Sequence, residues 1–235
     1  MSTITLNGTA SNTKTGLIIL RLPPITRPKM RYQQVTVDGR PGDIITELGY
    51  EAYDREFEIG LAGGFDIDEI TAYFSGSGKA VFSNEDDKEY DYTFLERVDY
   101  EKLLRFKTAK VKMHVQPYKH EANETPTVIT PAGGTFTLTN KGNTPSAPSL
   151  DIIGSGTVTF SVPDGLLTRT FQVDMTDDAE VIVDTEALEC YFGTVLKNRL
   201  VTGNIGTFRL QPGANTITYT GTVTQVTATN ISRWI

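Results

Sequence analysis

The sequence has little cysteine and little histidine, and both scarcities limit its chemistry. Its 235 residues include a single cysteine, Cys190. An internal disulfide and a cysteine-based zinc site are therefore excluded. Cys190 lies in the apolar run LECYF, where we expect a buried structural thiol rather than a nucleophile. The two histidines, His114 and His120, lack a recognisable partner motif, and we expect His114 to be a surface-facing strand residue.

Long apolar runs and surplus positive charge are also missing. No stretch of about 18 uncharged apolar residues occurs, so we expect no membrane insertion. The first residues, MSTITLNGTASNTKTG, show no charged segment followed by an apolar core, and we expect no signal peptide. A net charge of -7 and a pI near 4.9 disfavour general nucleic-acid binding, which needs a surplus of Lys and Arg.

Candidate catalytic and ligand-binding motifs fail when their residues are inspected. Gly76-Ser77-Gly78-Lys79 resembles a phosphate-binding loop, but Ala80 follows the lysine and Tyr73 stands where the first glycine belongs. Asp66 and Asp68 are better explained by the dipole of a helix start than by a metal. The chain has 29 Asp and Glu residues, so some pair of carboxylates will lie at the distance that glycosidases use, and such a pair is almost no evidence for catalysis. We therefore predict no cofactor, no metal site and no enzymatic activity.

The stretch from Leu17 to Ile44 has the pattern of a long excursion from a folded body. Leu17 to Leu22 is an apolar run that Pro23 and Pro24 end, and Tyr32 to Val37 resumes a strand before the turn at Asp38-Gly39. The basic side chains of the stretch outnumber its acids; they are Arg21, Arg27, Lys29, Arg31 and Arg40. A solvated loop explains this surplus, and the alternative is an arm that contacts a negatively charged neighbour.

The composition changes near Thr125. Residues 1–125 carry 16 Lys or Arg and 20 Asp or Glu, whereas residues 126–235 carry 6 and 9, with 22 threonines. The change coincides with EANETPTVITPAGG, which is rich in chain-breaking residues. We therefore predict two domains, 1–125 and 126–235.

The first domain is predicted to be mostly β with one short helix. Alternating apolar residues indicate a strand over Tyr53 to Leu61. The helix follows in FDIDEITAYFSGSG, with Asp66 as its cap and Glu69 completing a capping-box-like pair. Further strands are expected over Lys79 to Ser83, Glu89 to Phe94 and Ala109 to Val115, the first two forming a hairpin around residues 84–87.

The second domain shows only strand patterns, which favour a β-sandwich or jelly roll. Short Thr- and Val-rich runs are separated by turn residues. They cover Thr135 to Thr139, Ser149 to Ile153, Thr157 to Val162, Thr168 to Val173, Glu180 to Val183, Leu188 to Phe192, Asn215 to Thr220 and Thr222 to Thr227.

The order of these motifs resembles the distal tail proteins of siphophages. The first half has a basic ITRP segment, a VDGRPG turn, the ITAYFSGSGKAVFS segment and a strand ending in QPY. The second half is similar to the galectin-like β-sandwich of that family. It contains NKGNTPSAPSLDIIGSGTVTFSV, IVDTEALECYF, FRLQPGANTITYTG and ISRWI, with the strongest matches at Asn143 to Pro148, Ile153 to Gly156 and Leu210 to Asn215.

The resemblance implies a virion structural protein. Six copies would form a ring at the distal end of a long non-contractile tail, between the tail tube protein and the tail-associated hub or lysin protein, with receptor-binding proteins as further partners. Assembly would occur in the bacterial host cytoplasm, and DNA would pass through the ring without specific binding. The N-terminal domains would make the ring, and an arm of about residues 20–42 would contact the neighbouring subunit from Leu22 to Gly42.

Charge suggests how the arm would be received. The segment EDDKEYD, from Glu85 to Asp91, is acidic and is expected at a hairpin tip. Two interpretations stay open: the segment is a solvated surface, or it is the contact site for the basic arm of a neighbouring subunit. The interface candidates are Arg21, Leu22, Ile25, Arg27, Lys29, Arg31, Arg40, Glu85, Asp86 and Asp87, with Leu20, Leu22 and Ile25 supplying apolar contact.

Two rival functions stay open at this point. A carbohydrate-binding β-sandwich is favoured by the second domain, although sugar binding usually needs exposed aromatics and the only tryptophan, Trp234, lies in the apolar terminus ISRWI. The absence of a large insertion in this domain also disfavours the built-in carbohydrate module of larger family members. A glycan- or peptidoglycan-cleaving enzyme is favoured by carboxylate number alone.

Overall fold

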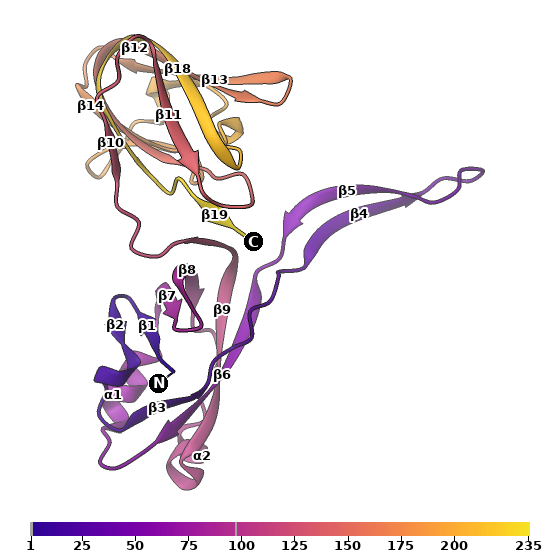
Figure 1. The fold of residues 1–235 in the computed structure, drawn as a ribbon, viewed down its shortest axis with the longest axis vertical. Coiled ribbons are helices and arrows are strands. Elements are labelled where there is room, and N and C mark those ends of the chain that lie inside the picture. Colours follow the sequence, from indigo (N-terminus) through magenta and orange to yellow (C-terminus); the bar gives the residue numbers. More distant parts are fainter. Residues whose placement is uncertain (1, 97) are drawn as a thin grey trace. The chain divides into compact units, whose positions relative to one another are not determined.

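The chain is mainly β, as predicted, and it divides into two compact units. A computed structural model describes residues 2–96 and 98–235. Unit 1 extends to Ala122 and includes Ile235, and unit 2 is Asn123–Trp234. Figure 1 shows their strands and the short helices of unit 1.

Unit 1 is a single curled sheet with helices on it and a separate two-stranded ribbon. The sheet order is β2-β1-β7-β8-β9-β6-β3. The elements are β1 (Ile4–Leu6), β2 (Thr9–Ala10), a 3-10 helix (Ser11–Thr13), β3 (Leu17–Arg21), β4 (Met30–Thr36), β5 (Asp43–Tyr50), β6 (Tyr53–Leu61), α1 (Ile67–Tyr73), β7 (Ser77–Phe82), β8 (Glu85–Thr93), α2 (Tyr100–Phe106) and β9 (Thr108–Glu121).

Helix α1 begins where its capping residues place it. The Asp66 side chain accepts hydrogen bonds from the backbone N–H groups of Asp68 and Glu69, which confirms the predicted cap. Ile70 and Tyr73 are buried. The Tyr73 hydroxyl donates to the Ile4 carbonyl at 2.7 Å, so the helix is fixed to the first strand of the sheet.

A second helix, α2, was not predicted from the sequence. Asp99 caps it by accepting from the Lys102 N–H at 2.8 Å, and Lys107 ends it in the left-handed region with φ 59°. With seven residues and one buried apolar side chain, Leu103, it has too little helical periodicity to be recognised.

The core of unit 1 lies between the sheet and α1 and holds aromatic and aliphatic side chains from β1, β3, β6, β7, β8 and β9. One charged residue occupies this inner face. Arg55 is on the same side of β6 as Phe57 and Ile59, as the alternation predicted, and is only 2% exposed. On the opposite face of β6, Asp54 Oδ1 lies 2.8 Å from His114 Nδ1, so His114 faces outward as expected.

Unit 2 consists of strands and 3-10 turns. The elements are β10 (Thr127–Ile129), β11 (Thr135–Asn140), β12 (Ser149–Asp164), β13 (Leu167–Met175), β14 (Glu180–Asp184), β15 (Glu189–Phe192), β16 (Val195–Leu196), 3-10 helices (Asn198–Leu200 and Ile205–Thr207), β17 (Val201–Gly203), β18 (Gly213–Thr229) and β19 (Arg233–Trp234). Two pairs of predicted short strands are in fact the two long strands β12 and β18.

Bends in these long strands produce the sandwich. β12 and β18 pair along both halves, with register shifts between Ile153 and Gly154 and between Ser155 and Thr159. On one side of the bend β14 and β10 join them, and on the other β13 and β11 do. A Cβ on Gly221 would lie 2.4 Å from the Thr157 carbonyl oxygen, so only glycine fits where the strands approach.

The core of unit 2 fills the space between the two halves. Its centre is aromatic, with Phe160 stacked on Phe171 at 5.4 Å between centroids and Phe171 edge-on to Phe208 at 5.0 Å. Cys190 belongs to this core and is fully buried, which confirms the prediction of a structural thiol. Burial raises the pKa of its thiol.

Candidate interaction surface

The ribbon of β4 and β5, which we call the arm, is exposed along most of its length. The two strands pair only with each other, and Figure 1 shows the arm extending away from the sheet of unit 1. It includes a return strand, Asp43–Tyr50, beyond the predicted limit of residue 42. The adjacent Ile44 and Ile45 in this strand break the apolar alternation, so its pattern was missed.

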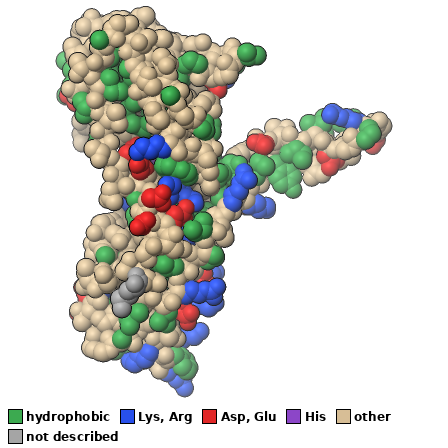
Figure 2. All heavy atoms as spheres, in the orientation of Figure 1, with side chains coloured by type: hydrophobic (Ala, Val, Ile, Leu, Met, Phe, Trp, Pro, Cys, Tyr) green, Lys and Arg blue, Asp and Glu red, His purple; other side chains and the backbone are tan. Residues whose placement is uncertain are grey.

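One face of the arm is aliphatic. Val35 is the cross-strand partner of Ile44, and residues two apart along each strand share a face. The resulting row is Val35, Val37, Ile44 and Leu48, and all four side chains are exposed. Figure 2 shows hydrophobic side chains along the arm, together with basic side chains at its root and near its tip and some acidic ones. A two-stranded ribbon is marginal alone in water, and an exposed apolar row indicates a contact surface.

Side chains from the sheet hold the root of the arm, where Pro23 and Pro24 supply no N–H groups. The Asn84 side-chain amide donates to the Pro23 carbonyl at 3.1 Å, and the Arg55 Nη2 donates to the Pro24 carbonyl at 3.1 Å. These bonds replace the backbone ladder that the prolines interrupt. The direction in which the chain leaves the sheet is therefore fixed by β6 and by the β7–β8 turn.

The predicted basic residues lie along this root and arm. Arg27 donates to the Tyr50 hydroxyl at 2.9 Å and also lies over the Tyr50 ring. Arg31 donates to the Leu48 carbonyl at 3.2 Å, and Lys29 approaches Glu51 at 3.9 Å. These contacts join the two strands of the arm. Much of the arm's positive charge thus has a structural partner within the chain.

The remaining predicted arm-side residues differ in exposure. Arg21 ends β3 opposite Glu58, and Arg40 lies in the exposed loop that joins β4 to β5. Ile25 is exposed, as is Leu20. Leu22 instead packs against the core of unit 1, so most of its apolar surface is already covered.

The acidic segment at Glu85 to Asp91 is arranged differently from the prediction. The turn is at Ser83 and Asn84, and Glu85 already belongs to β8. Glu85 is nearly buried, accepts from Lys119 Nζ at 2.6 Å and accepts from the Tyr90 hydroxyl. Burial and this bond raise the pKa of Tyr90. The sequence could not reveal that Lys119 lies beside Glu85.

The other acids of the segment are largely paired as well. Asp87 forms an ion pair with Lys88, and Lys79 lies 3.1 Å from both Glu89 and Asp91. Asp86 and Asp87 are exposed. The segment is therefore a locally neutralised surface rather than a free acidic tip.

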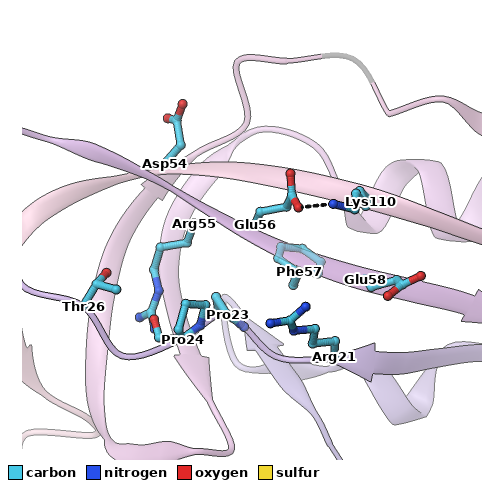
Figure 3. A pocket seen from close by; sticks show the side chains of 10 residues that line it. All are labelled: Arg21, Pro23, Pro24, Thr26, Asp54, Arg55, Glu56, Phe57, Glu58 and Lys110. Carbon is cyan, nitrogen blue, oxygen red and sulfur yellow. Dashed lines mark hydrogen bonds and ion pairs between the residues drawn. The ribbon is translucent and has the colours of Figure 1, made fainter.

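A pocket of about 340 Å³ lies at the root of the arm (Figure 3). Its lining residues are Arg21, Pro23, Pro24, Thr26, Asp54, Arg55, Glu56, Phe57, Glu58 and Lys110. The Arg55 guanidinium lies 4.4 Å from the Phe82 ring centroid and 4.3 Å from that of Tyr90. Lys110 is bound to Glu56 at 2.7 Å.

Other kinds of site find little support in the described part of the chain. Residues 2–96 and 98–235 contain no group of three or more His, Cys, Asp or Glu side chains placed to hold a metal ion. Their helices are too short and too polar to cross a bilayer. Within the described residues of unit 2, Phe192 is the only exposed aromatic side chain, and Trp234 is partly buried.

Comparison with known proteins finds similarity in structure but not in sequence. No known family and no curated protein matches the sequence. Among solved structures, the crystal structure of SPP1 Dit (gp 19.1), described as a paradigm of the hub adsorption apparatus in phages that infect Gram-positive bacteria, matches with a TM-score of 0.66. The match covers 100% of both chains at 12% identity. The chain has the Dit fold.

Two further solved structures are similar to this chain. The phage P2 baseplate in its activated conformation with Ca matches with a TM-score of 0.56 at 9% identity, and the same baseplate with Sr with 0.53 at 10%. Each match covers 97% of both chains. The resemblance to distal tail proteins that the sequence motifs predicted is confirmed at the level of the fold.

Proposed function

We propose that this chain is a structural virion protein that forms a hexameric ring at the distal end of a long non-contractile phage tail. The ring connects the tail tube to the tail-tip hub and the host-adsorption apparatus. The supporting observation is the match to SPP1 Dit over the full length of both chains, which includes both units rather than a β-sandwich alone. In this proposal residues 1–125 make the ring and residues 126–235 form the second domain.

The arm supports assembly on physical grounds. Its aliphatic face is exposed in the single chain, and burial of such a row on a neighbour removes apolar surface from water. The surface that receives the arm differs from the arm itself. A contact between two different surfaces is heterologous and generates a ring when its rotation closes.

The partners follow from this position in the tail. The proposed partners are a tail tube protein on one side, a tail-associated hub or lysin protein on the other, and receptor-binding proteins. DNA passes through the ring without specific binding. Six chains of -7 give a ring charge of about -42, which disfavours adhesion of a polyanion.

Native mass spectrometry combined with negative-stain electron microscopy tests the proposal. Six chains of 25.9 kDa give a ring of about 155 kDa, and we expect this species or a stack of two such rings. A chain that stays monomeric across a broad concentration range, together with virion images that lack a ring, would overturn the proposal.

A further inference from the structure

One sheet of unit 2 has an outward face that its strand register defines. In β12, Leu150 and Ile152 are fully buried in the core, so Asp151 and Ile153, which alternate with them, point away from it. Cross-strand partners extend the position of Asp151 into one row: Val128, Thr227, Asp151, Ile182, Tyr191 and Leu196. We call this row, with the outward residues on either side of it, the outer face of unit 2.

The middle and one end of the row are apolar. Ile182 and Tyr191 are half-buried, and Leu196 is 61% exposed on the edge strand β16. Ile153 adds a second isoleucine on the neighbouring strand, diagonal to Ile182. Single exposed apolar side chains are ordinary on a protein surface, whereas a contiguous group across adjacent strands indicates a contact site.

Carboxylates flank this apolar group. Glu180 stands opposite Ile153 on one side of the row, and Glu189 lies on the other side. The side chains of Asp151, Glu180 and Glu189 form no hydrogen bond or ion pair with any described residue. Oδ1 of Asp151 is buried, which leaves its other carboxylate oxygen for contact. Burial and the neighbouring Glu180 raise the pKa of Asp151, so the chain itself supplies no compensating cation here.

The outer face holds negative charge that the rest of the unit does not share. The strands of this sheet, β10, β12, β14, β15, β16 and β18, contain no Lys or Arg. Residues 126–235 carry six basic and nine acidic side chains, and four of the acids lie on the outer face: Asp151, Glu180, Asp184 and Glu189. The remainder has six basic and five acidic side chains. The outer face is therefore complementary to a positively charged surface.

The residues of the outer face favour a protein as the occupant over a glycan or a second outer face. A glycan would stack on an exposed aromatic ring, and the ring in the row, Tyr191, is half-buried. Isoleucines beside unpaired carboxylates match the aliphatic stem and the cationic head of Lys or Arg. Six strands at about 4.8 Å spacing give a row of about 24 Å, which suits a protein surface. Two outer faces would repel each other, because both are acidic.

We propose that the outer face of unit 2 is a docking site for a second protein of the same virion, whose surface carries Lys and Arg among aliphatic side chains. Its cationic groups pair with Asp151, Glu180 and Glu189, and its aliphatic side chains cover Ile182 and Leu196. The inference rests on the proposed function for the source of the partner, a virion.

Zero-length cross-linking with a carbodiimide tests the contact in purified virions, because this reagent joins a carboxylate to a lysine only where the two are in contact. We expect peptides that contain Glu180 or Glu189 to be joined to Lys peptides of one other virion protein. Asp177 is the internal control, an exposed acid between β13 and β14 and outside the outer face, and should not be joined to that protein.

The outcomes separate the docking site from the ring. Cross-links from the four acids only to peptides of this chain overturn the docking site in favour of a contact between copies, and the absence of any cross-link from them overturns it outright. Either result leaves a hexamer seen by native mass spectrometry intact. Binding to a glycan array that Glu180→Lys abolishes, without the cross-link, overturns the protein partner in favour of a sugar. A chain that is absent from purified virions overturns the proposed function and the docking site together.

Charge reversal then measures the contribution of the acids, with the cross-linked protein purified as the binding partner. Glu180→Lys should weaken binding about three- to tenfold, and the loss should shrink as salt is raised. Asp177→Lys makes the same change of charge three residues away and should alter binding less than about twofold. Both variants should unfold at the parent's temperature, which separates lost docking from lost folding. An equal loss in the two variants would show general charge attraction and contradict a defined contact.

Discussion

The aliphatic face of the arm gives the most direct test of assembly. Val35 and Ile44 are cross-strand partners, with 43% and 39% of each residue exposed. The double change Val35→Thr and Ile44→Thr keeps residues suited to a strand but removes apolar surface from the contact. Because both positions are solvent-exposed in the single chain, its own free energy of unfolding should change by less than about 0.5 kcal/mol.

The expected loss comes from surface that is buried only on assembly. Complete burial of an aliphatic side chain contributes about 1.5 to 3 kcal/mol, and more than half of each residue is already covered, which leaves about 1 kcal/mol per position. Two positions therefore weaken one junction by about 2 kcal/mol, or roughly 30-fold in its dissociation constant. Every junction of a closed ring changes together, so the concentration needed for rings should rise steeply.

The assay is native mass spectrometry over a dilution series, with thermal unfolding of the single chain measured in parallel. The control is Leu166→Thr with Leu167→Thr, at the exposed turn between β12 and β13 of unit 2. The control should assemble as the parent does. If the arm variant assembles at the parent's midpoint, the aliphatic face does not contribute to the junction and the reasoning fails.

Three further predictions concern stability. Gly221→Ala should lower the free energy of unfolding by about 2 kcal/mol or more in denaturant titration, because φ is +95° and the new Cβ meets backbone, whereas Gly165→Ala at an open turn should cost about half as much. Lys119→Met should cost about 3 kcal/mol by the same measurement, since it leaves Glu85 nearly buried without its cation, and a loss below about 1 kcal/mol would show that water compensates. Burial and the neighbouring Glu180 raise the folded pKa of Asp151, so its contribution is favourable below the unfolded pKa and is lost as pH rises through the folded one. Asp151→Asn should therefore flatten the pH dependence of unfolding above pH 4, and an unchanged slope would contradict that assignment.

The sequence predicted those elements that depend on residues close together in the chain. Helix α1 was predicted from Asp66, whose side chain accepts hydrogen bonds from backbone N–H groups of the first turn. The predicted return bond of the capping box does not form, because the Glu69 carboxylate instead accepts from Lys14 Nζ and from the Thr15 N–H. The alternation of β6 placed Arg55 on the inner face of the sheet. It did not show that Phe82 and Tyr90 lie on either side of the guanidinium, because those rings come from β7 and β8.

Glycine misled the prediction in unit 2. Gly154, Gly156 and Gly221 were taken as ends of strands, yet β12 and β18 continue through all three. These residues permit bends and a close approach of two backbones, and that role depends on a strand some 70 residues away. A single sequence does not distinguish such a bend from a turn.

The charge of the candidate interface could not be predicted either, because it depends on residues from distant strands. The acids of EDDKEYD suggested a free surface, but Lys79 and Lys119 neutralise three of them from other strands. The arm itself was predicted from its prolines and its Asp-Gly turn, which are local features. The alternation of the sequence also places Val35 and Val37 on one face, but Ile44 and Leu48 join that face only when β4 and β5 are in register.

The unpaired edges of the arm have a consequence for the newly made chain. Each edge of the β4–β5 ribbon exposes backbone N–H and C=O groups that pair with any extended strand, and Pro28 and Pro41 interrupt that capacity only outside the strands. A chain waiting for its neighbours is accordingly at risk of joining the wrong strand, and that risk grows with concentration and waiting time. In the assembly proposed above, the speed with which a new chain meets its neighbours therefore sets how much of it is lost to wrong strand pairing.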